Sequence, residues 1–325
     1  MDRGSGEVRT VREFADNSLL HMLFGPHNAH LDHIERALGV AMASRGNRVT
    51  ITGAAERVDQ ASGVLDGLYQ RLESGQAVGA AEVDAALRMG DEDDASDPAL
   101  VLVTRKRHIR PRTPMQAEYI RAMDRFELVF GLGPAGTGKT YLAVAKAVAM
   151  MIKGEVDRII LSRPAVEAGE RLGFLPGDLR DKVDPYLRPL YDALHDMLPG
   201  DQVTKKLAAG DIEVAPLAFM RGRTLANSFV ILDEAQNTTP MQMKMLLTRL
   251  GEHSRMVVTG DPSQVDLPPG ARSGLDDAIA ILRDLKEIGA IRFSDRDVVR
   301  HGLVTKIVRA YEAHAVTHKK SDRER

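Results

Sequence analysis

The feature that most restricts the fold of this 325-residue chain is a glycine-rich loop between an apolar segment and a helical one. Residues 133–140 read Gly-Pro-Ala-Gly-Thr-Gly-Lys-Thr and match the pattern G-x-x-x-x-G-K-[ST]. Residues 127–130 before the loop are typical of a short buried strand, and residues 141–153 after it have helical periodicity without proline. A strand, a glycine loop and a helix in this order predict a site for nucleotide phosphates.

The residue types of the loop fit that chemistry. Glycines allow successive backbone N–H groups to turn toward a β-phosphate, and the following helix N-terminus adds its positive dipole. Lys139 is expected to reach the β- and γ-phosphates, and the Thr140 hydroxyl to ligate Mg²⁺. The expected nucleotide-binding residues are Gly133, Pro134, Ala135, Gly136, Thr137, Gly138, Lys139 and Thr140.

A pair of carboxylates follows a second buried strand. Residues 229–232 are apolar, and Asp233 and Glu234 come directly after them. Parallel α/β sheets place their ligands at the carboxyl ends of strands. We therefore expect Asp233 to hold Mg²⁺ and Glu234 to be the general base that activates water, a combination that favours hydrolysis over transfer to a small acceptor.

A third apolar strand, residues 256–259, ends in the turn Gly-Asp-Pro-Ser-Gln at 260–264. The Gln264 amide can hydrogen-bond a γ-phosphate or the attacking water and so sense whether the phosphate is present. Gly-Asp-Pro is also ordinary turn chemistry. The sensor interpretation rests on the position of this turn one strand after the acidic pair.

The first 75 residues predict a small domain with the order strand, helix, helix, strand, strand, helix. This order resembles a KH domain, which grips single-stranded nucleic acid through a G-x-x-G loop. Gly25 matches the first glycine, but Asn28 stands at the last position and the loop holds no Lys or Arg. A small packing or dimerisation domain is therefore the alternative to RNA binding.

The middle of the chain predicts a linker followed by a basic segment. Residues 76–99 are interrupted by glycines and contain an acidic run at 91–94, whereas residues 105–112 carry five Lys or Arg side chains. That basic segment is either a solvated strand or a contact to phosphate or RNA. We expect a KH-like α+β domain at 1–75, an acidic linker at 76–99 and a nucleotide-hydrolysing domain at 100–325.

Composition narrows the class and the compartment. Aromatic residues make up 4% of the chain, so its cores must be built from aliphatic side chains on helices and parallel strands, which favours an α/β fold. A net charge of -2 argues against a uniformly basic nucleic-acid-binding surface. The absence of cysteine excludes disulfides and thiolate metal sites and favours a reducing cytosol. The charged residues 1–12 predict no signal peptide, no membrane span is visible, and we expect a cytoplasmic protein.

Taken together, these motifs resemble the PhoH-like family of P-loop ATPases, whose core is similar to the first RecA-like domain of superfamily 1 helicases. The resemblance rests on residues 112–116, 162–167, 172–177, 233–237 and 260–264, and the front domain resembles the bacterial short form. It implies that Gln116 reads the adenine edge and that residues 162–167 and 172–177 contact single-stranded nucleic acid. It also implies ATP hydrolysis in RNA metabolism.

A superfamily 1 motor closes its site with an arginine from a second lobe, and no second lobe is readable after Lys139. The missing wall would then come from another copy of the chain, and a closed ring gives every copy an equivalent neighbour. The candidate arginines are Arg221, Arg223, Arg296 and Arg300.

The sequence therefore predicts an RNA-stimulated ATPase or helicase-like remodeller that binds ATP, Mg²⁺ and single-stranded RNA. The resemblance further implies a hexameric ring and an endoribonuclease partner in rRNA maturation. Two alternatives stay open. One is a nucleotide-dependent scaffold or timer with slow hydrolysis. The other is a P-loop kinase, against which Glu234 and Gln264 argue because both suit the activation of water.

Overall fold

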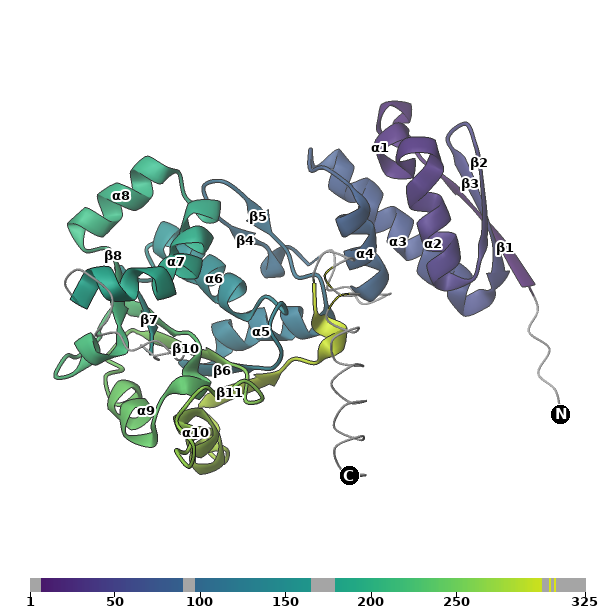
Figure 1. Cartoon of the computed structure of the whole chain (residues 1–325). Coiled ribbons are helices and arrows are strands. Elements are labelled where there is room, and N and C mark those ends of the chain that lie inside the picture. The colour runs from purple at the N-terminus through teal and green to yellow at the C-terminus, as the bar shows by residue number, and fades with distance from the viewer. Residues whose placement is uncertain (1–6, 90–96, 165–178, 300–303, 305–306, 308–325) are drawn as a thin grey trace, which may run out of the picture. The chain divides into compact units, whose positions relative to one another are not determined.

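The computed structural model describes residues 7–89, 97–164, 179–299, 304 and 307. It divides into two compact units: residues 1–125 with 196–199, and residues 126–195 with 200–325 (Figure 1). Each unit is described by itself. Among the described residues, no helix is long and apolar enough to cross a membrane.

The first unit begins with a three-stranded antiparallel sheet of order β1-β3-β2. Buried side chains such as Val49 and Ile51 of the sheet pack with Ile34 and Leu65 of the helices in one apolar core. The elements are β1 (Glu7–Glu13), α1 (Leu20–Phe24), α2 (Ala29–Leu38), β2 (Ala41–Arg45), β3 (Arg48–Ala54) and α3 (Ala55–Glu73). The expected element order is confirmed, while the likeness to a KH domain remains a prediction.

Part of the segment expected to be a linker belongs to this core. Residues 80–89 form α4 (Ala80–Met89), which contacts α2 and α3. Its Val83 is fully buried in the cluster of the first unit, because one turn of apolar residues is enough to close the gap between those two helices. The proposed boundaries of the domains stay a prediction.

The rest of the first unit carries the basic segment. It contains β4 (Leu102–Val103) and β5 (His108–Ile109), which pair antiparallel, and α5 (Pro114–Arg125). Two members of the segment are ion-paired: Arg107 lies 3.1 Å from Asp196, and Arg112 lies 3.5 Å from Glu82. Arg105 and Lys106 are exposed. With two of its five basic side chains ion-paired in this way, the segment offers a smaller positive surface than its sequence suggests.

The second unit is built on a six-stranded parallel sheet of order β11-β6-β10-β9-β7-β8, which confirms the expected α/β class. The strands are β6 (Leu128–Leu132), β7 (Arg158–Arg163), β8 (Ile212–Pro216), β9 (Ser228–Leu232), β10 (Arg255–Gly260) and β11 (Ile288–Arg292). The helices are α6 (Lys139–Lys153), α7 (Leu179–Met197), α8 (Gly200–Ala209), α9 (Pro240–Leu247) and α10 (Gly274–Leu282).

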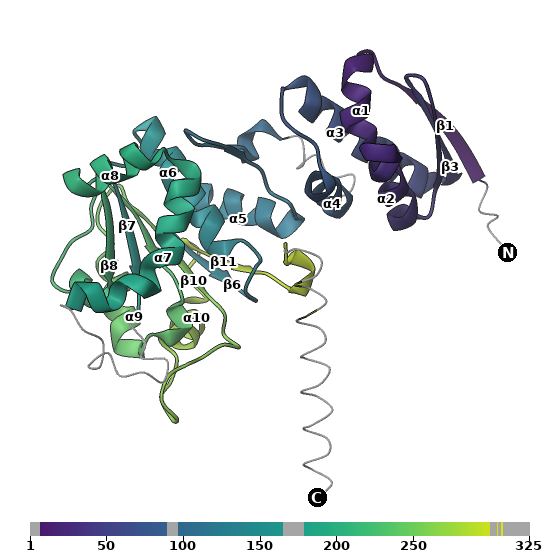
Figure 2. The ribbon, with the colours of Figure 1, turned by 45° about the horizontal axis from the view of Figure 1, so that its top comes forward.

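The sheet lies between helices. Figures 1 and 2 show α6 on one side of it and α9 and α10 on the other. Strand side chains such as Phe130, Val230 and Val258 pack with Met243 of α9 and Leu275 of α10 in a second core.

The strand order decides which polar residues meet. Strand β10 lies between β6 and β9, and β7 lies on the other side of β9. Because parallel strands end at the same edge of a sheet, the glycine loop, the acidic pair and the polar turn after β10 come to one edge.

Candidate active site

The glycine loop has a backbone that only glycine adopts easily. Gly133, Gly136 and Gly138 have φ values of 134°, 85° and 85°, in the region that L-residues avoid. Gly133 also lies against the backbone of Phe293: a Cβ built there would be 2.4 Å from the Phe293 carbonyl oxygen. The loop therefore fits tightly beside the segment that follows β11, and α6 begins directly after it at Lys139.

Lys139 is buried, with 8% of its surface exposed, and it lies inside the loop. Its Nζ donates hydrogen bonds to the carbonyl oxygens of Gly133 and Pro134 at 2.6 and 2.8 Å. The Thr137 hydroxyl donates to the same Pro134 oxygen at 3.0 Å. The ammonium group is thus held at the mouth of the loop, where the sequence places the phosphate-binding cation.

Asp233 joins the loop to the sheet. One of its oxygens, Oδ1, accepts hydrogen bonds from the hydroxyls of Thr140 at 2.6 Å and Thr259 at 2.7 Å. Sequence reasoning paired Thr140 with Asp233 but missed Thr259, the penultimate residue of β10. A hydroxyl beside a buried carboxylate is the kind of oxygen donor set that Mg²⁺ prefers, with water and phosphate oxygens completing the shell.

Glu234 has an unusual backbone and two charged or polar partners. Its φ and ψ of 53° and 39° are left-handed, a conformation that costs a non-glycine residue about 1–3 kcal/mol. Arg163 Nη2 donates to Glu234 Oε1 at 2.6 Å, and Gln236 Nε2 donates to Oε2 at 2.6 Å. Both oxygens of the expected base are therefore oriented by neighbours.

Arg163 was not expected at these carboxylates, because the resemblance places it in a stretch that contacts nucleic acid. One signal was present in the sequence: Arg163 follows the apolar run 159–161 after one residue, Ser162, which places it at the carboxyl end of a buried strand. Residues 165–178 of the same stretch lie outside the described residues.

The turn after β10 is connected to the acidic pair. Gln236 Oε1 accepts a hydrogen bond from the Asp261 backbone N–H at 3.1 Å. The Asp261 carboxylate accepts from the Ser263 backbone and hydroxyl and, at 2.8 Å, from the Gln264 amide. Gln264 thus belongs to a turn linked through Gln236 to Glu234, and its role as a sensor stays a prediction.

Gln116 lies at the start of α5 in the first unit and is buried. Its Oε1 accepts a hydrogen bond from the Arg112 backbone N–H at 2.7 Å, and its own N–H donates to the Thr113 hydroxyl. The first bond orients the side-chain amide, and the second, from the Gln116 backbone, belongs to the first turn of the helix. Recognition of adenine by Gln116 stays a prediction.

The four candidate arginines differ in their surroundings. Arg223 donates two hydrogen bonds of 2.7 Å to the carboxylate of Glu213, and these bonds raise the pKa of its guanidinium above the ordinary value. Arg221 is exposed in the turn beside Gly222, and Arg296 is exposed in the short helical turn at 295–297. Arg300 lies outside the described residues.

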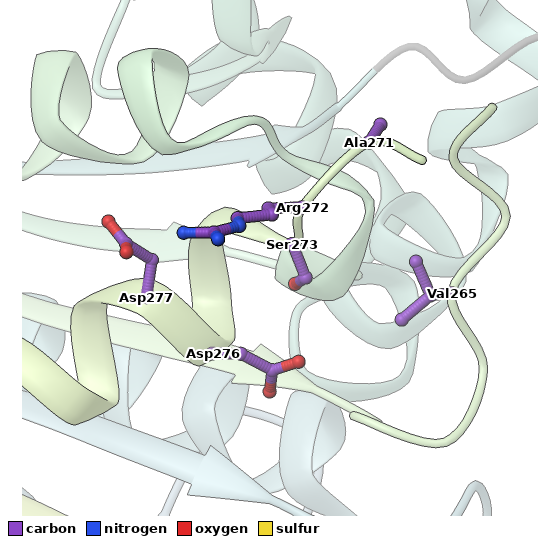
Figure 3. A pocket seen from close by; sticks show the side chains of 6 residues that line it. All are labelled: Val265, Ala271, Arg272, Ser273, Asp276 and Asp277. Atoms are coloured by element: carbon purple, nitrogen blue, oxygen red, sulfur yellow. The ribbon is translucent and has the colours of Figure 1, made fainter. Parts of the chain in front are cut away.

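A pocket of about 460 Å³ opens beside the polar turn. Figure 3 shows its lining side chains, Val265, Ala271, Arg272, Ser273, Asp276 and Asp277, which come from the loop after β10 and the start of α10. The Ser273 hydroxyl is buried without a hydrogen-bond partner. Its charged lining consists of one guanidinium and two carboxylates, and it holds none of the residues expected at the nucleotide site.

Comparison with known proteins points to one family. A family model described as PhoH-like protein matches residues 108–312. The PhoH-like protein of Bacillus subtilis (strain 168) is 49% identical over 296 residues, which cover 89% of this chain and 93% of that protein. The PhoH-like protein of Mycobacterium tuberculosis (strain ATCC 25618 / H37Rv) is 52% identical over 294 residues, covering 89% of this chain and 84% of that protein.

Solved structures are more distant. The Sulfolobus solfataricus SWI2/SNF2 ATPase core in complex with dsDNA is 17% identical, with a TM-score of 0.35, and the match covers 63% of this chain and 48% of that chain. A likeness at this level bears on no functional conclusion.

The tight fit of the loop gives a testable expectation for Gly133→Ala. The new methyl group would meet the immovable carbonyl of Phe293, and the left-handed strain would be added to the clash. Gly154→Ala is the matched control, because Gly154 has a φ of 73° but nothing within 4 Å of a built Cβ. Gly133→Ala should lower the free energy of unfolding by about 1–3 kcal/mol more than the control does. Urea denaturation measures both, and equal losses would show that the close approach is absent.

Proposed function

The chain belongs to the PhoH-like family, and from this premise we propose that it is an ATPase that acts on RNA. The observation that carries the proposal is the meeting of three elements at one sheet edge. The buried ammonium of Lys139, the bonded pair Thr140 and Asp233, and the oriented carboxylate of Glu234 lie beyond the ends of β6 and β9, which flank β10. Phosphate binding, metal binding and activation of water each need one of these.

Binding of the nucleotide begins with the loop. Its N–H groups and the N-terminus of α6 suit the β-phosphate, and Lys139 can exchange its two carbonyl partners for phosphate oxygens without leaving the loop. Thr140 and Asp233 would hold Mg²⁺, which neutralises phosphate charge when bound. Gln116 is proposed to select adenine. A cytoplasmic location is proposed as well, and the lack of cysteine favours it.

Hydrolysis requires a base for water. Glu234 is the proposed base: Arg163 and Gln236 occupy one acceptor position on each of its oxygens, and a carboxylate has about four such positions. Water can therefore bind Glu234 without displacing either neighbour. Gln264 is proposed to respond to the γ-phosphate, since its turn is bonded to Gln236 through the Asp261 backbone.

Two substitutions separate the binding and hydrolysis steps. Lys139→Ala should abolish turnover with weakened ATP binding, because the phosphate cation is lost. Glu234→Gln should bind ATP normally and hydrolyse it roughly 10²–10⁴-fold more slowly, because only the base is lost. Binding is measured with a fluorescent ATP analogue and turnover by phosphate release. Equal hydrolysis by wild type and Glu234→Gln would contradict the assignment, and phosphate transfer to an added acceptor without release would indicate a kinase.

RNA binding is proposed from the family and from two surfaces of the first unit. One is the basic segment, in which the Arg105 and Lys106 side chains are exposed. The other is the loop at Gly25, which is tightly packed: a Cβ built on Gly25 would lie 2.8 Å from the ring of His30. Glycine is thus required at the first position of this loop, as the KH-like interpretation expects.

Single-stranded RNA should raise the ATPase rate several-fold, and the stimulation should fall steeply with salt because the contacts are to phosphates. Arg105→Ala with Lys106→Ala should weaken the stimulation, while Arg9→Ala, an exposed arginine of β1, serves as the control. The measurement is phosphate release over a series of RNA and salt concentrations. A rate that RNA does not change would favour the alternative of a nucleotide-dependent timer or scaffold.

A ring of copies, hexameric as the resemblance implies, is proposed to complete the site, with a nuclease of rRNA maturation as partner. Among the candidate arginines that the structure describes, we propose Arg221 as the one that reaches a neighbouring copy. Arg223 is held by Glu213, and Arg296 lies in a segment bound to its own loop, where the Val299 N–H donates to the Gly136 carbonyl at 2.9 Å. Arg221 is exposed at a turn, and we propose that its long side chain enters another copy.

Mixing variants tests the shared site. Arg221→Ala should bind ATP but lose roughly 10³–10⁵-fold in rate, the contribution of such arginines elsewhere. Combined with Lys139→Ala under conditions that allow exchange of copies, it should regain activity, since some interfaces then hold an intact loop and an intact arginine. Arg223→Ala, Arg296→Ala and Arg300→Ala are tested in parallel. No recovery with any of them, or an active monomer by mass measurement, would show that the site is complete within one chain.

A further inference from the structure

The guanidinium of Arg163 lies between the two carboxylates of the acidic pair. Its Nη2 donates to Glu234 Oε1 at 2.6 Å, and its Nε is 3.7 Å from Asp233 Oδ2. The side chains of Arg163 and Asp233 are 19% and 9% exposed, so water screens the attraction between these two charges only weakly. Glu234 is more open, at 38%.

The backbones on both sides of this contact are fixed by the sheet. Arg163 is the last residue of β7, the direct neighbour of β9, and the Asp233 N–H donates to the Ser162 carbonyl at 2.9 Å. Arg163 and Glu234 therefore extend from adjacent strand ends that are bonded to each other. A long side chain that starts from so firm a position can hold its partner in one orientation.

Glu234 needs such a partner for two reasons. Two neighbouring carboxylates repel each other, and a cation between them offsets the repulsion. The left-handed backbone of Glu234 is also strained, and strained residues persist only where their surroundings determine them. Gln236 supports one oxygen of Glu234, and Arg163 supports the other.

We propose that Arg163 is a positioning residue for hydrolysis, which holds the carboxylate of Glu234 where it can polarise the attacking water. The inference rests on the proposed ATPase function and adds a residue to it. Arg163 acts through Glu234, so its loss slows the chemical step and leaves the binding of ATP to the loop unchanged. A planar guanidinium suits the role because its fork of donors can face two carboxylates at once.

Steady-state kinetics of Arg163→Ala test this. The variant should lose roughly 10–100-fold in kcat, the scale expected when a reacting group is misplaced by about 1 Å. Its KM for ATP should stay close to that of wild type. Arg163→Lys should recover part of the rate, because an ammonium keeps one charged contact but cannot face both carboxylates. Arg158→Ala is the matched control: Arg158 is exposed at the opposite end of the same strand.

A double-mutant cycle separates positioning from a general loss of structure. If Arg163 acts through Glu234, Arg163→Ala should cause no further loss of rate in a Glu234→Gln background. A purely structural effect would multiply with that of Glu234→Gln. Urea denaturation of each variant tests whether the second unit is folded at the assay temperature. If Arg163→Ala is unfolded, Arg163→Gln offers a neutral replacement of similar shape.

Other results would overturn the inference. Unchanged kcat, a raised rate, or a raised KM at constant kcat would each show that Arg163 does not hold the base, as would multiplicative loss in the double variant. Failure of the proposed function looks different: wild type and Glu234→Gln would then have the same rate. That outcome overturns the ATPase assignment and the inference together. If Glu234→Gln lowers the rate of hydrolysis but Arg163→Ala does not, the inference alone is overturned.

Discussion

The rest of the site depends on the hydrogen bonds that the carboxylate of Asp233 accepts. A buried carboxylate must be hydrogen-bonded, and Asp233 meets this need with hydroxyls from two other elements, Thr140 of α6 and Thr259 of β10. One oxygen atom therefore ties the glycine loop, the acidic pair and the strand before the polar turn to a common point. Displacement of any of these elements would leave a buried polar group without its partner, which costs about 1–3 kcal/mol for a neutral group and more for a charge.

Close backbone packing extends this rigidity to the polar turn. A Cβ on Gly260 would lie 2.6 Å from the Leu275 side chain and 2.8 Å from Gln236 Oε1. A Cβ on Gly274, which begins α10, would lie 2.4 Å from the Thr239 carbonyl. The absence of side chains at these two glycines lets α10 and Gln236 approach the end of β10. Gln236 can then bridge Glu234, the proposed base, and the Asp261 backbone, so that one side chain links the turn to the acidic pair.

The sequence predicts what is local and misses what depends on strand order. The glycine loop and the apolar strands before Asp233 and Gly260 are readable because residue type and spacing alone define them, and the structure confirms those strands and helix α6. Arg163 is different: its contact with Glu234 exists because β7 is the neighbour of β9, which no local pattern encodes. The burial of Val83 could not be predicted for a similar reason. A single apolar turn among glycines and acidic residues is typical of a linker, and its burial depends on the positions of two other helices, α2 and α3. The pairing of Arg223 with Glu213 likewise requires β8 and the following turn to be known.

The charges of the described site also bear on the shared-site model. Asp233 and Glu234 are balanced by two cations, Lys139 at the loop and Arg163 between the carboxylates. A nucleoside triphosphate would add several negative charges to this set, and further cations would stabilise them together with the N–H groups of the loop. Mg²⁺ held by Thr140 and Asp233 would supply part of that charge, whereas Arg163 is engaged with Glu234. The shared-site proposal adds an arginine of a neighbouring copy for the charge that would develop on the γ-phosphate, which leaves the proposed base undisturbed.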